Sequence, residues 1–360
     1  MFAVLVKEYG YEYDAAVDTT LLECTHNRFA PWTENEPLLL RSGRDALKVV
    51  AREYDRLTVF LPALSCESMV HPFVQYGHAV KFYCLTENYA IDVADVDRLA
   101  AQENGPILFV YMDYFGCRSA EDMTLESLQS KWQNMLFLED RTHQLIHPSQ
   151  HQFQADYVVA SLRKWINVPD GGLLWSNHPL KNGIIAHETT FFEQRLYAQN
   201  LRRKFFETGD HRIKDEYRSI FSRVSDIMDQ SEIPAAMSAY SFEMAKRAQW
   251  DYIRDIRRGN AETLLGILKD CAKLKLIQPS AGQSDLYVAF LVDDRDRIQR
   301  ELSALGIFCT VIWPLSDEQQ AACSVAKDTC QRMLAAPCDQ RYGIEDMHYI
   351  GKEIVRIINE

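Results

Sequence analysis

Short apolar runs alternate with helix-length amphipathic segments between about residue 40 and residue 175. The runs predicted as strands are 57–61, 79–83, 107–111, 135–138, 157–160 and 172–175. These runs are apolar at nearly every position, which is typical of strands covered on both faces. The pattern therefore predicts an α/β fold with a mostly parallel sheet between helices.

Longer helical segments follow, and then strands and helices mix again. Residues 185–265 are dense in the paired charges of solvated helix faces. The rest of the chain contains predicted strands at 286–292 and 307–312 and a closing helix. We expect a large domain over residues 1–245 and a smaller C-terminal α/β domain over residues 246–360.

Polar residues follow three successive predicted strands at the points where these strands end. Asp113 follows the third run, Asp140 the fourth, and Ser161 with Lys164 the fifth. The carboxyl ends of parallel strands lie at one edge of a sheet, where ligands of α/β proteins gather. An acid, a hydroxyl group and an amine are therefore expected to converge at this edge.

The chemistry of Lys164 and Asp140 suits an aldehyde cofactor. A partly desolvated primary amine at a strand end can bond to an aldehyde and later move a proton between two carbons. A carboxylate can keep a pyridine nitrogen protonated, so that the ring accepts electrons. A lone lysine is ordinarily a solvated charge, and Asp140 could merely end a strand or cap a helix. Together the two residues favour pyridoxal phosphate chemistry.

The phosphate of such a cofactor needs backbone N–H groups, ideally where a helix begins. Ser42-Gly43-Arg44 offers a glycine turn at the start of a predicted helix, where Gly43 allows close approach and Arg44 could add charge. Such turns also cap helices in proteins that bind no phosphate. Ser161 is a second phosphate candidate. His143 could lie over the ring or contact its 3′ oxygen, or it could be a packing residue.

Composition and charge exclude several other classes of protein. The net charge of −12 and the absence of a long Lys/Arg run argue against nucleic acid and anionic membranes as partners. Residues 1–6 are apolar, but Lys7 and Glu8 follow, so we expect neither a signal peptide nor a membrane span, and a cytoplasmic protein. No Gly-x-Gly-x-x-Gly follows the first strand, which argues against a dinucleotide-binding enzyme.

The nine cysteines are scattered and show no metal-ligand spacing. We therefore expect no metal site and no disulfide framework, and interpret most of the cysteines as small buried hydrophobes in a reducing compartment. Any one of them could still be a functional thiol.

The motifs, taken in order, resemble the DegT/DnrJ/StrS group of sugar aminotransferases among the fold-type-I pyridoxal phosphate enzymes. Leu138-Glu-Asp-Arg-Thr-His143 is similar to the family's Ile-Glu-Asp-Ala-Ala-Gln/His, and the segment from Lys164 to Gly172 resembles Lys-Asn-Leu-Thr-Thr-Gly-Glu-Gly-Gly. Further matching segments are 41–47, 61–62, 110–116, 305–307, 313–315 and 333–342. The resemblance covers nearly the whole chain. It implies a three-layer αβα large domain with a smaller C-terminal domain.

The resemblance also implies roles for individual residues. Lys164 would be the Schiff-base lysine, Asp140 the partner of the pyridine nitrogen and His143 a ring contact. Phosphate contacts would come from the turn at Ser42 and Gly43. The implied reaction is transamination of a keto sugar, usually nucleotide-linked, with glutamate or a similar amino donor. A homodimer with sites at the subunit interface and a place in polysaccharide or amino-sugar biosynthesis are implied too.

Several positions depart from the family pattern. Arg44 replaces the hydroxyl residue after Ser-Gly, and no ring-stacking aromatic stands near Leu64 and Cys66. The loop before Lys164 is shorter, and no clear Gly-x-Asn-x-Arg segment is present. These departures keep two alternatives open, namely a catalytically degenerate relative with a binding role and a dehydratase-like enzyme that retains the cofactor. Dehydratase relatives typically carry histidine in place of the lysine, which ranks that alternative lower.

Overall fold

A seven-stranded sheet lies at the centre of the structure, a computed structural model that describes residues 6–15, 30–32, 36–147, 151–181, 185–277 and 285–360. The strand order is β2-β8-β7-β6-β5-β3-β4. The strands are β2 (Leu38–Leu40), β3 (Thr58–Pro62), β4 (Ala79–Tyr83), β5 (Ile107–Tyr111), β6 (Met135–Asp140), β7 (Tyr157–Ser161) and β8 (Gly172–Ser176). The strand β8 is antiparallel to both of its neighbours, β2 and β7, and all other neighbouring strands are parallel. The predicted mostly parallel sheet is confirmed.

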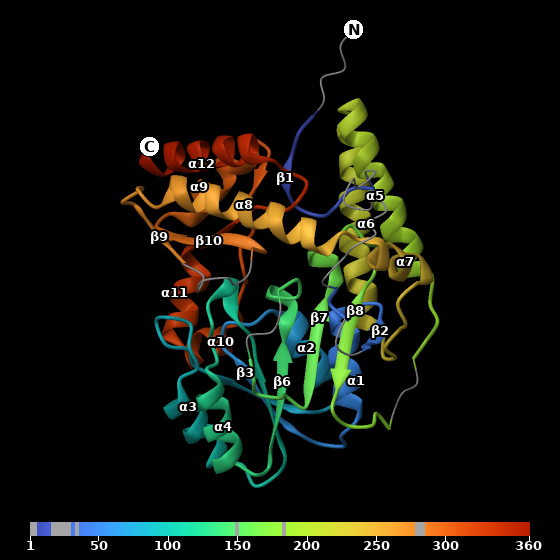
Figure 1. Ribbon diagram of the computed structural model, residues 1–360, viewed down its shortest axis with the longest axis vertical. Coiled ribbons are helices and arrows are strands. Elements are labelled where there is room, and N and C mark those ends of the chain that lie inside the picture. The colour runs from blue at the N-terminus through green and yellow to red at the C-terminus, as the bar shows by residue number, and fades with distance from the viewer. Residues whose placement is uncertain (1–5, 16–29, 33–35, 148–150, 182–184, 278–284) are drawn as a thin grey trace.

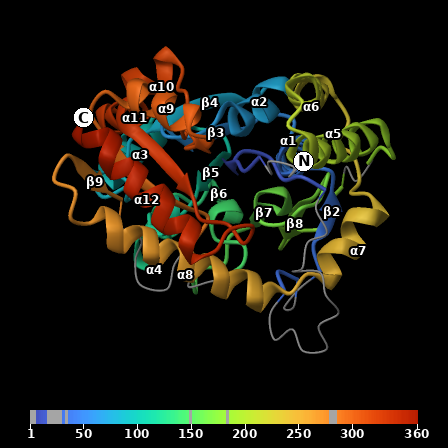
Figure 2. The same ribbon diagram turned by 90° about the horizontal axis from the view of Figure 1, so that it is seen from above.

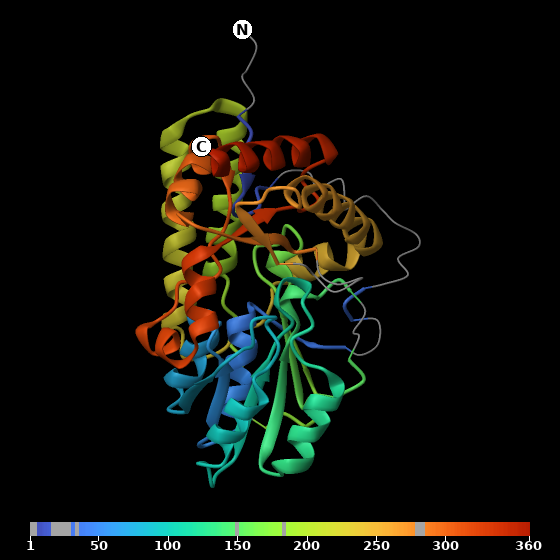
Figure 3. The same cartoon turned by 90° about the vertical axis from the view of Figure 1, so that its left-hand side faces the viewer.

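Helices cover both faces of this sheet, as Figures 1 and 3 show. The helices α1 (Gly43–Arg52) and α2 (Glu67–Gln75) lie on one face, and α3 (Val93–Ala100) and α4 (Asp122–Lys131) lie on the other. Right-handed crossovers require this arrangement, because the chain moves from β3 to β4 in one direction and then returns past β3 to β5 and β6. The predicted three-layer αβα architecture is confirmed.

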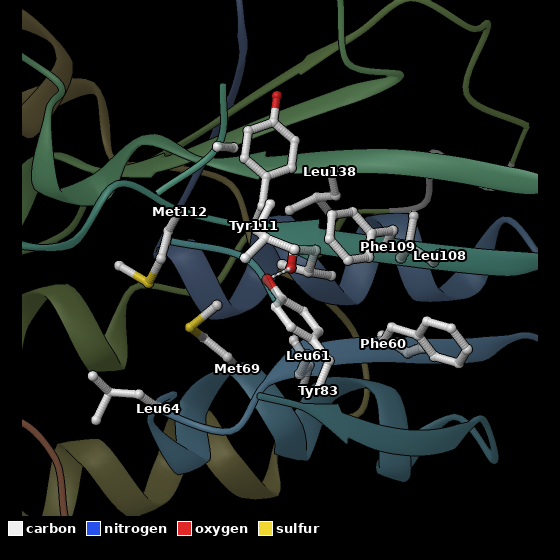
Figure 4. Close-up of a cluster of buried hydrophobic side chains, with 14 of the residues drawn as sticks. Phe60, Leu61, Leu64, Met69, Tyr83, Leu108, Phe109, Tyr111, Met112 and Leu138 are labelled. Carbon is white, nitrogen blue, oxygen red and sulfur yellow. Dashed lines mark hydrogen bonds between the residues drawn. The ribbon is translucent and has the colours of Figure 1, made fainter. Parts of the chain in front are cut away.

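The core of the large sheet is built from the apolar strands that the sequence pattern predicts. Figure 4 shows Phe60 of β3, Tyr83 of β4 and Phe109 of β5 among aliphatic neighbours. The rings of Tyr83 and Phe109 are stacked with centroids 5.0 Å apart. The hydroxyl of Tyr83 donates a hydrogen bond of 2.9 Å to the carbonyl of Val110, which satisfies its polar end inside the core.

A second, smaller sheet belongs to the C-terminal part. Its strands are β9 (Leu274–Leu276), β10 (Tyr287–Val292) and β12 (Met333–Pro337), all antiparallel, with β10 in the middle. The helices α8 (Trp250–Leu268) and α12 (Ile344–Asn359) pack side by side against it, with α9 (Arg295–Ala304) next to α12, as Figure 2 shows from above. The predicted smaller C-terminal α/β unit is therefore present.

The N-terminal segment contributes to this C-terminal unit. The strand β1 (Tyr9–Gly10) pairs in parallel with β11 (Ile307–Phe308), and Tyr9 is buried in the same hydrophobic cluster as Phe290 and Met347. The division of the chain at residue 245 stays a prediction.

The remaining helices form the connection that the sequence predicts as helical, together with two short elements near the C-terminus. They are α5 (Thr190–Thr208), α6 (His211–Gln230), α7 (Ala239–Arg247), α10 (Asp317–Ala322) and α11 (Ser324–Arg332). Between α5 and α6, Gly209 adopts a left-handed φ of 67° and Asp210 caps the next helix, so the chain reverses within two residues. In the described part of the chain, every helix is too short or too polar to cross a membrane.

One pair of cysteines corrects the expectation of reduced thiols. Cys84, just after β4, and Cys323, at the start of α11, form a disulfide with their Cα atoms 4.8 Å apart. The two residues are 239 positions apart in the sequence, so only the packing of the C-terminal part against the large sheet brings them together. Sequence spacing carries no signal for such a pair. Cys24 lies outside the described residues.

Candidate active site

The predicted site residues meet at one edge of the large sheet because of the strand directions. Gly172, the first residue of β8, pairs with Ser161, the last residue of β7, and with Leu40, the last residue of β2. Because β8 is antiparallel, its start lies where β2 and β7 end. In Figure 1 this edge faces the C-terminal unit. Asp140, the last residue of the neighbouring β6, lies at the same edge.

Gly172 lets the start of α1 reach across β8. A Cβ atom at this position would lie 2.1 Å from the carbonyl carbon of Ser42, a distance that no side chain tolerates. Gly43 consequently lies close to β7, and a Cβ atom on Gly43 would be 3.7 Å from the Cβ of Ser161. The structure thus brings together two of the predicted phosphate contacts, Gly43 and Ser161.

Lys164 ends the 3-10 turn η4 (Leu162–Lys164) that follows β7. The turn is anchored by the next residue, Trp165, which is fully buried and donates a 2.7 Å hydrogen bond to the carbonyl of Thr142. Lys164 lines a cavity of about 300 Å³. Among the described residues, its amine forms no hydrogen bond and no ion pair. The side chain is therefore held at a cavity and left available for chemistry.

Asp140 is buried next to this turn. Its carboxylate accepts a 2.8 Å hydrogen bond from the backbone N–H of Thr142. Burial raises the pKa of Asp140, while the hydrogen bond from Thr142 and the charge of Lys164 act in the opposite direction. Asp140 therefore lies within electrostatic range of Lys164, although it is not one of the residues that line the cavity.

His143 is only 1% exposed and also lies outside the cavity lining. Its ring stacks on that of Trp313 at a centroid distance of 5.6 Å, and its Nδ1 accepts a 3.4 Å hydrogen bond from the N–H of Phe115. Burial and the charge of Lys164 lower the pKa of His143 well below its ordinary value, so the ring is neutral. Trp313 comes from the C-terminal unit, so this contact joins that unit to the edge of the large sheet.

The side chains of Ser42 and Arg44 are engaged away from this cavity. The hydroxyl of Ser42 donates a 2.6 Å hydrogen bond to Asp45, whose carboxylate is bound by two nitrogens of Arg41 at 2.8 and 3.0 Å. Arg44 forms an ion pair of 2.8 Å with Asp229 on α6. The backbone N–H groups of Gly43 and Arg44 have no acceptor within the part of the chain that the structure describes. Any anion bound by this turn would be held by the backbone.

Asp113 is also committed to structural contacts. Its carboxylate accepts hydrogen bonds from the N–H of Ser119 at 2.7 Å and from the amide of Gln144 at 3.0 Å, and it lies 3.0 Å from the ring nitrogen Nε2 of His151. This strand-end acid stabilises a neighbouring loop and does not line the cavity.

The cavity contains cationic residues that sequence reasoning missed. Arg163 directly precedes Lys164, and Arg257 of α8 and Arg341 approach from the C-terminal unit. Tyr13 from the N-terminal segment completes this wall, and its hydroxyl accepts a 2.7 Å hydrogen bond from Arg257. The position of Arg163 beside the lysine was a usable signal. The positions of the other three depend on how distant segments pack, which no local pattern reveals.

Known structures share this fold, although no protein-family model matches the chain and no curated protein matches it. A DegT/DnrJ/EryC1/StrS aminotransferase from Brucella abortus superposes with a TM-score of 0.63 at 14% identity, covering 90% of this chain and 86% of that one. PseC of Helicobacter pylori, an aminotransferase involved in pseudoaminic acid biosynthesis, gives 0.65 at 16% identity, covering 98% and 100%.

A third structure, Bacillus subtilis NtdA with bound pyridoxamine phosphate, gives a TM-score of 0.64 at 12% identity over 90% of this chain and 73% of that chain. These structures include members of the family that the sequence motifs resemble. At such low identities the similarity establishes the fold, and the predicted fold class is confirmed.

Proposed function

We propose that this protein is a pyridoxal phosphate-dependent aminotransferase that acts on a keto sugar, with an amino acid such as glutamate as donor. The observation that carries the proposal is the unengaged amine of Lys164 at a cavity, with the buried Asp140 within electrostatic range on the neighbouring strand. This pairing stands at the sheet edge where α/β folds bind ligands.

The residues at this edge fit a phosphorylated pyridine aldehyde. Lys164 offers an amine for the aldehyde carbon, and Asp140 offers a carboxylate for the ring nitrogen. The unpaired N–H groups at Gly43 and Arg44, with Ser161 beside them, form a cradle suited to an oxyanion. His143 is neutral and can contact the ring or its oxygen without adding charge.

When bound, pyridoxal phosphate supplies an aldehyde that takes up an amino group and a ring that accepts electrons. The residues of this chain have simpler tasks. Lys164 would accept the proton that leaves the donor's α-carbon and return it to the cofactor carbon on the other side of the amino nitrogen. Asp140 would hold the proton of the ring nitrogen, and burial keeps water from competing for it.

The proposed function includes a class of acceptor substrate, an oligomeric state and a cellular location. PseC acts in pseudoaminic acid biosynthesis, and the structures that share this fold therefore support an amino-sugar or polysaccharide pathway. We propose a nucleotide-linked keto sugar as acceptor, a homodimer as the working form and a cytoplasmic location.

The test follows the first half of the transamination reaction, between the cofactor and the amino donor, by absorbance. The purified protein with added pyridoxal phosphate is expected to be yellow, and glutamate is expected to remove the visible absorption as the amino group moves to the cofactor. A panel of other amino acids identifies the donor. An unchanged spectrum with every donor would exclude transamination. Failure to retain the cofactor at all would favour the binding-role alternative, which the engaged side chains of Ser42 and Arg44 support.

Replacing Asp140 by asparagine separates catalysis from stability. Amino transfer is expected to fall by at least about 10²-fold, because the ring nitrogen loses its carboxylate. The raised pKa of Asp140 means that its ionisation in the folded state is costly, so stability falls as pH rises through that pKa. The cofactor-free variant should therefore unfold at an equal or higher temperature than the wild type at pH 7, and the difference should vanish in acid.

Asparagine preserves the acceptor for the N–H of Thr142, so the local turn should persist. The matched control is Asp255→Asn, which removes an exposed carboxylate on α8 and should leave both activity and melting temperature unchanged. Full activity in the Asp140 variant would contradict the assigned role.

A further inference from the structure

We propose that Arg163 is the anion-binding residue of the cavity beside Lys164, where its guanidinium holds an oxyanion group of the ligand that reacts at the lysine. This inference rests on the proposed function for the identity of the ligand. The oxyanion is either the phosphate of the cofactor or a carboxylate of the amino donor.

Arg163 lacks an internal counter-ion. Among the described residues it forms no ion pair, and its Nε atom is buried without a hydrogen-bond acceptor. Its contact with the protein is a cation–π interaction with Phe191, whose ring centroid lies 5.8 Å from the guanidinium carbon. A cation–π contact offsets only part of the cost of burying a charge. A bound anion would supply the counter-ion that Arg163 lacks.

Nearby acids are already used by other arginines. Glu12 accepts a 2.6 Å hydrogen bond from Arg195, and Asp339 lies 2.7 Å from Arg341. The pKa of Arg163 is lowered to about 9 by burial and by the charge of Arg195, with Glu12 acting in the opposite direction. The cavity thus has two internally paired acids and an excess of positive charge.

Arg257 adds to this positive charge but has no donor left for a ligand. The residue is only 1% exposed, and its guanidinium donates to the hydroxyl of Tyr13 at 2.7 Å, to the side chain of Gln340 at 2.8 Å and to backbone carbonyls that include Trp165. All of these acceptors are neutral oxygens. Arg257 therefore provides a fixed positive field under the lysine turn, while Arg163 provides free N–H groups.

The size and walls of the cavity limit the ligand. A volume of about 300 Å³ is at the small end of ligand pockets, so it suits an amino-acid-sized molecule or one end of a larger one. Tyr11, Tyr287 and Phe308 line it beside the charged groups. A guanidinium presents several N–H groups in a fixed fork that matches carboxylate and phosphate oxygens. Arg163 and Lys164 line the same small cavity, so an anion bound at Arg163 would lie near the reactive amine.

The experiment compares Arg163→Gln and Arg163→Lys with the matched control Arg203→Gln, which removes an exposed arginine that pairs with Glu207 on α5. Inorganic phosphate and glutarate are titrated separately, and binding is followed by the shift in melting temperature. Binding of pyridoxal phosphate is followed by absorbance. Arg163→Gln is expected to weaken binding of one anion by at least about tenfold, Arg163→Lys less, and the control not at all.

The pattern of losses identifies the source of the oxyanion. Weaker binding of phosphate and pyridoxal phosphate, with glutarate unchanged, assigns Arg163 to the cofactor. Weaker binding of glutarate alone assigns it to the donor carboxylate. Unchanged binding of both anions in the two variants, or no binding of either to the wild type, overturns the inference. If the Arg163 variants lose anion binding and the wild type shows no half-reaction with any donor, the anion site is supported and the proposed function is excluded.

Discussion

Replacement of Lys164 by alanine is expected to abolish covalent attachment of pyridoxal phosphate and to lower amino transfer by at least about 10³-fold. The described residues offer no second amine in the cavity lining. After borohydride reduction and proteolysis, mass spectrometry should find the cofactor on the peptide that contains residue 164 in the wild type and on no peptide of the variant. Single-turnover absorbance with glutamate should be flat.

The same variant should fold normally, because the amine of Lys164 makes no bond to any described residue that its removal would break. We expect a free energy of unfolding within about 0.5 kcal/mol of the wild type in the absence of cofactor. Lys204→Ala, an exposed lysine on α5, is the matched control and should retain attachment and activity. Attachment at full stoichiometry in the Lys164 variant would remove the basis of the proposed function.

The strands of the large sheet could be predicted because burial on both faces leaves continuous apolar runs. The segments 79–83 and 107–111 are observed as predicted, and the run at 135–138 extends to Asp140. The strand β2 spans only three residues, too few for a pattern to identify. The antiparallel direction of β8 was equally hidden, because an apolar run carries no direction.

Part of the candidate site followed from topology alone. Strand-end positions predicted that Asp140, Ser161 and Lys164 would share an edge. The structure places Asp140 and Ser161 at the ends of the neighbouring strands β6 and β7, and Lys164 in the turn that follows β7. Contacts between distant segments could not be predicted, since they depend on how these segments pack. The pairing of β1 with β11 holds the N-terminal segment that carries Tyr13, and the packing of the C-terminal unit places Arg257 at the cavity and Trp313 on His143.

The side-chain contacts of the predicted phosphate turn could not be predicted from the sequence either. Ser42 was predicted as a phosphate contact from its place before a glycine, yet its hydroxyl donates to Asp45. Ser42 and Asp45 are three residues apart. Arg41 holds the carboxylate of Asp45 in position, which favours the hydrogen bond from Ser42 to Asp45 over a contact with a ligand. Whether such a hydroxyl faces a ligand or its own helix depends on side-chain geometry that a motif does not record.

Replacing Gly172 by alanine is expected to destabilise the protein by about 3 kcal/mol and to weaken binding of pyridoxal phosphate. The new Cβ atom would lie 2.1 Å from the carbonyl carbon and oxygen of Ser42 and 2.7 Å from the nitrogen of Gly43. These are backbone atoms at the start of a capped helix, so they cannot rotate away as a side chain would. Either β8 or the first turn of α1 must move.

The matched controls are two glycines at which a methyl group has room. Gly266→Ala in α8 meets no atom within 4 Å and should raise stability by about 0.5–1 kcal/mol, since alanine favours the helix. Gly43→Ala places its Cβ in ordinary contact, 3.7 Å from Ser161, and serves as a control for folding only, because Gly43 belongs to the proposed anion cradle; it should fold like the wild type. Urea unfolding and absorbance titration with pyridoxal phosphate measure both effects. A Gly172 variant as stable as the wild type would mean that α1 does not cross β8 this closely, and Gly43 would then not reach Ser161 to form the anion cradle.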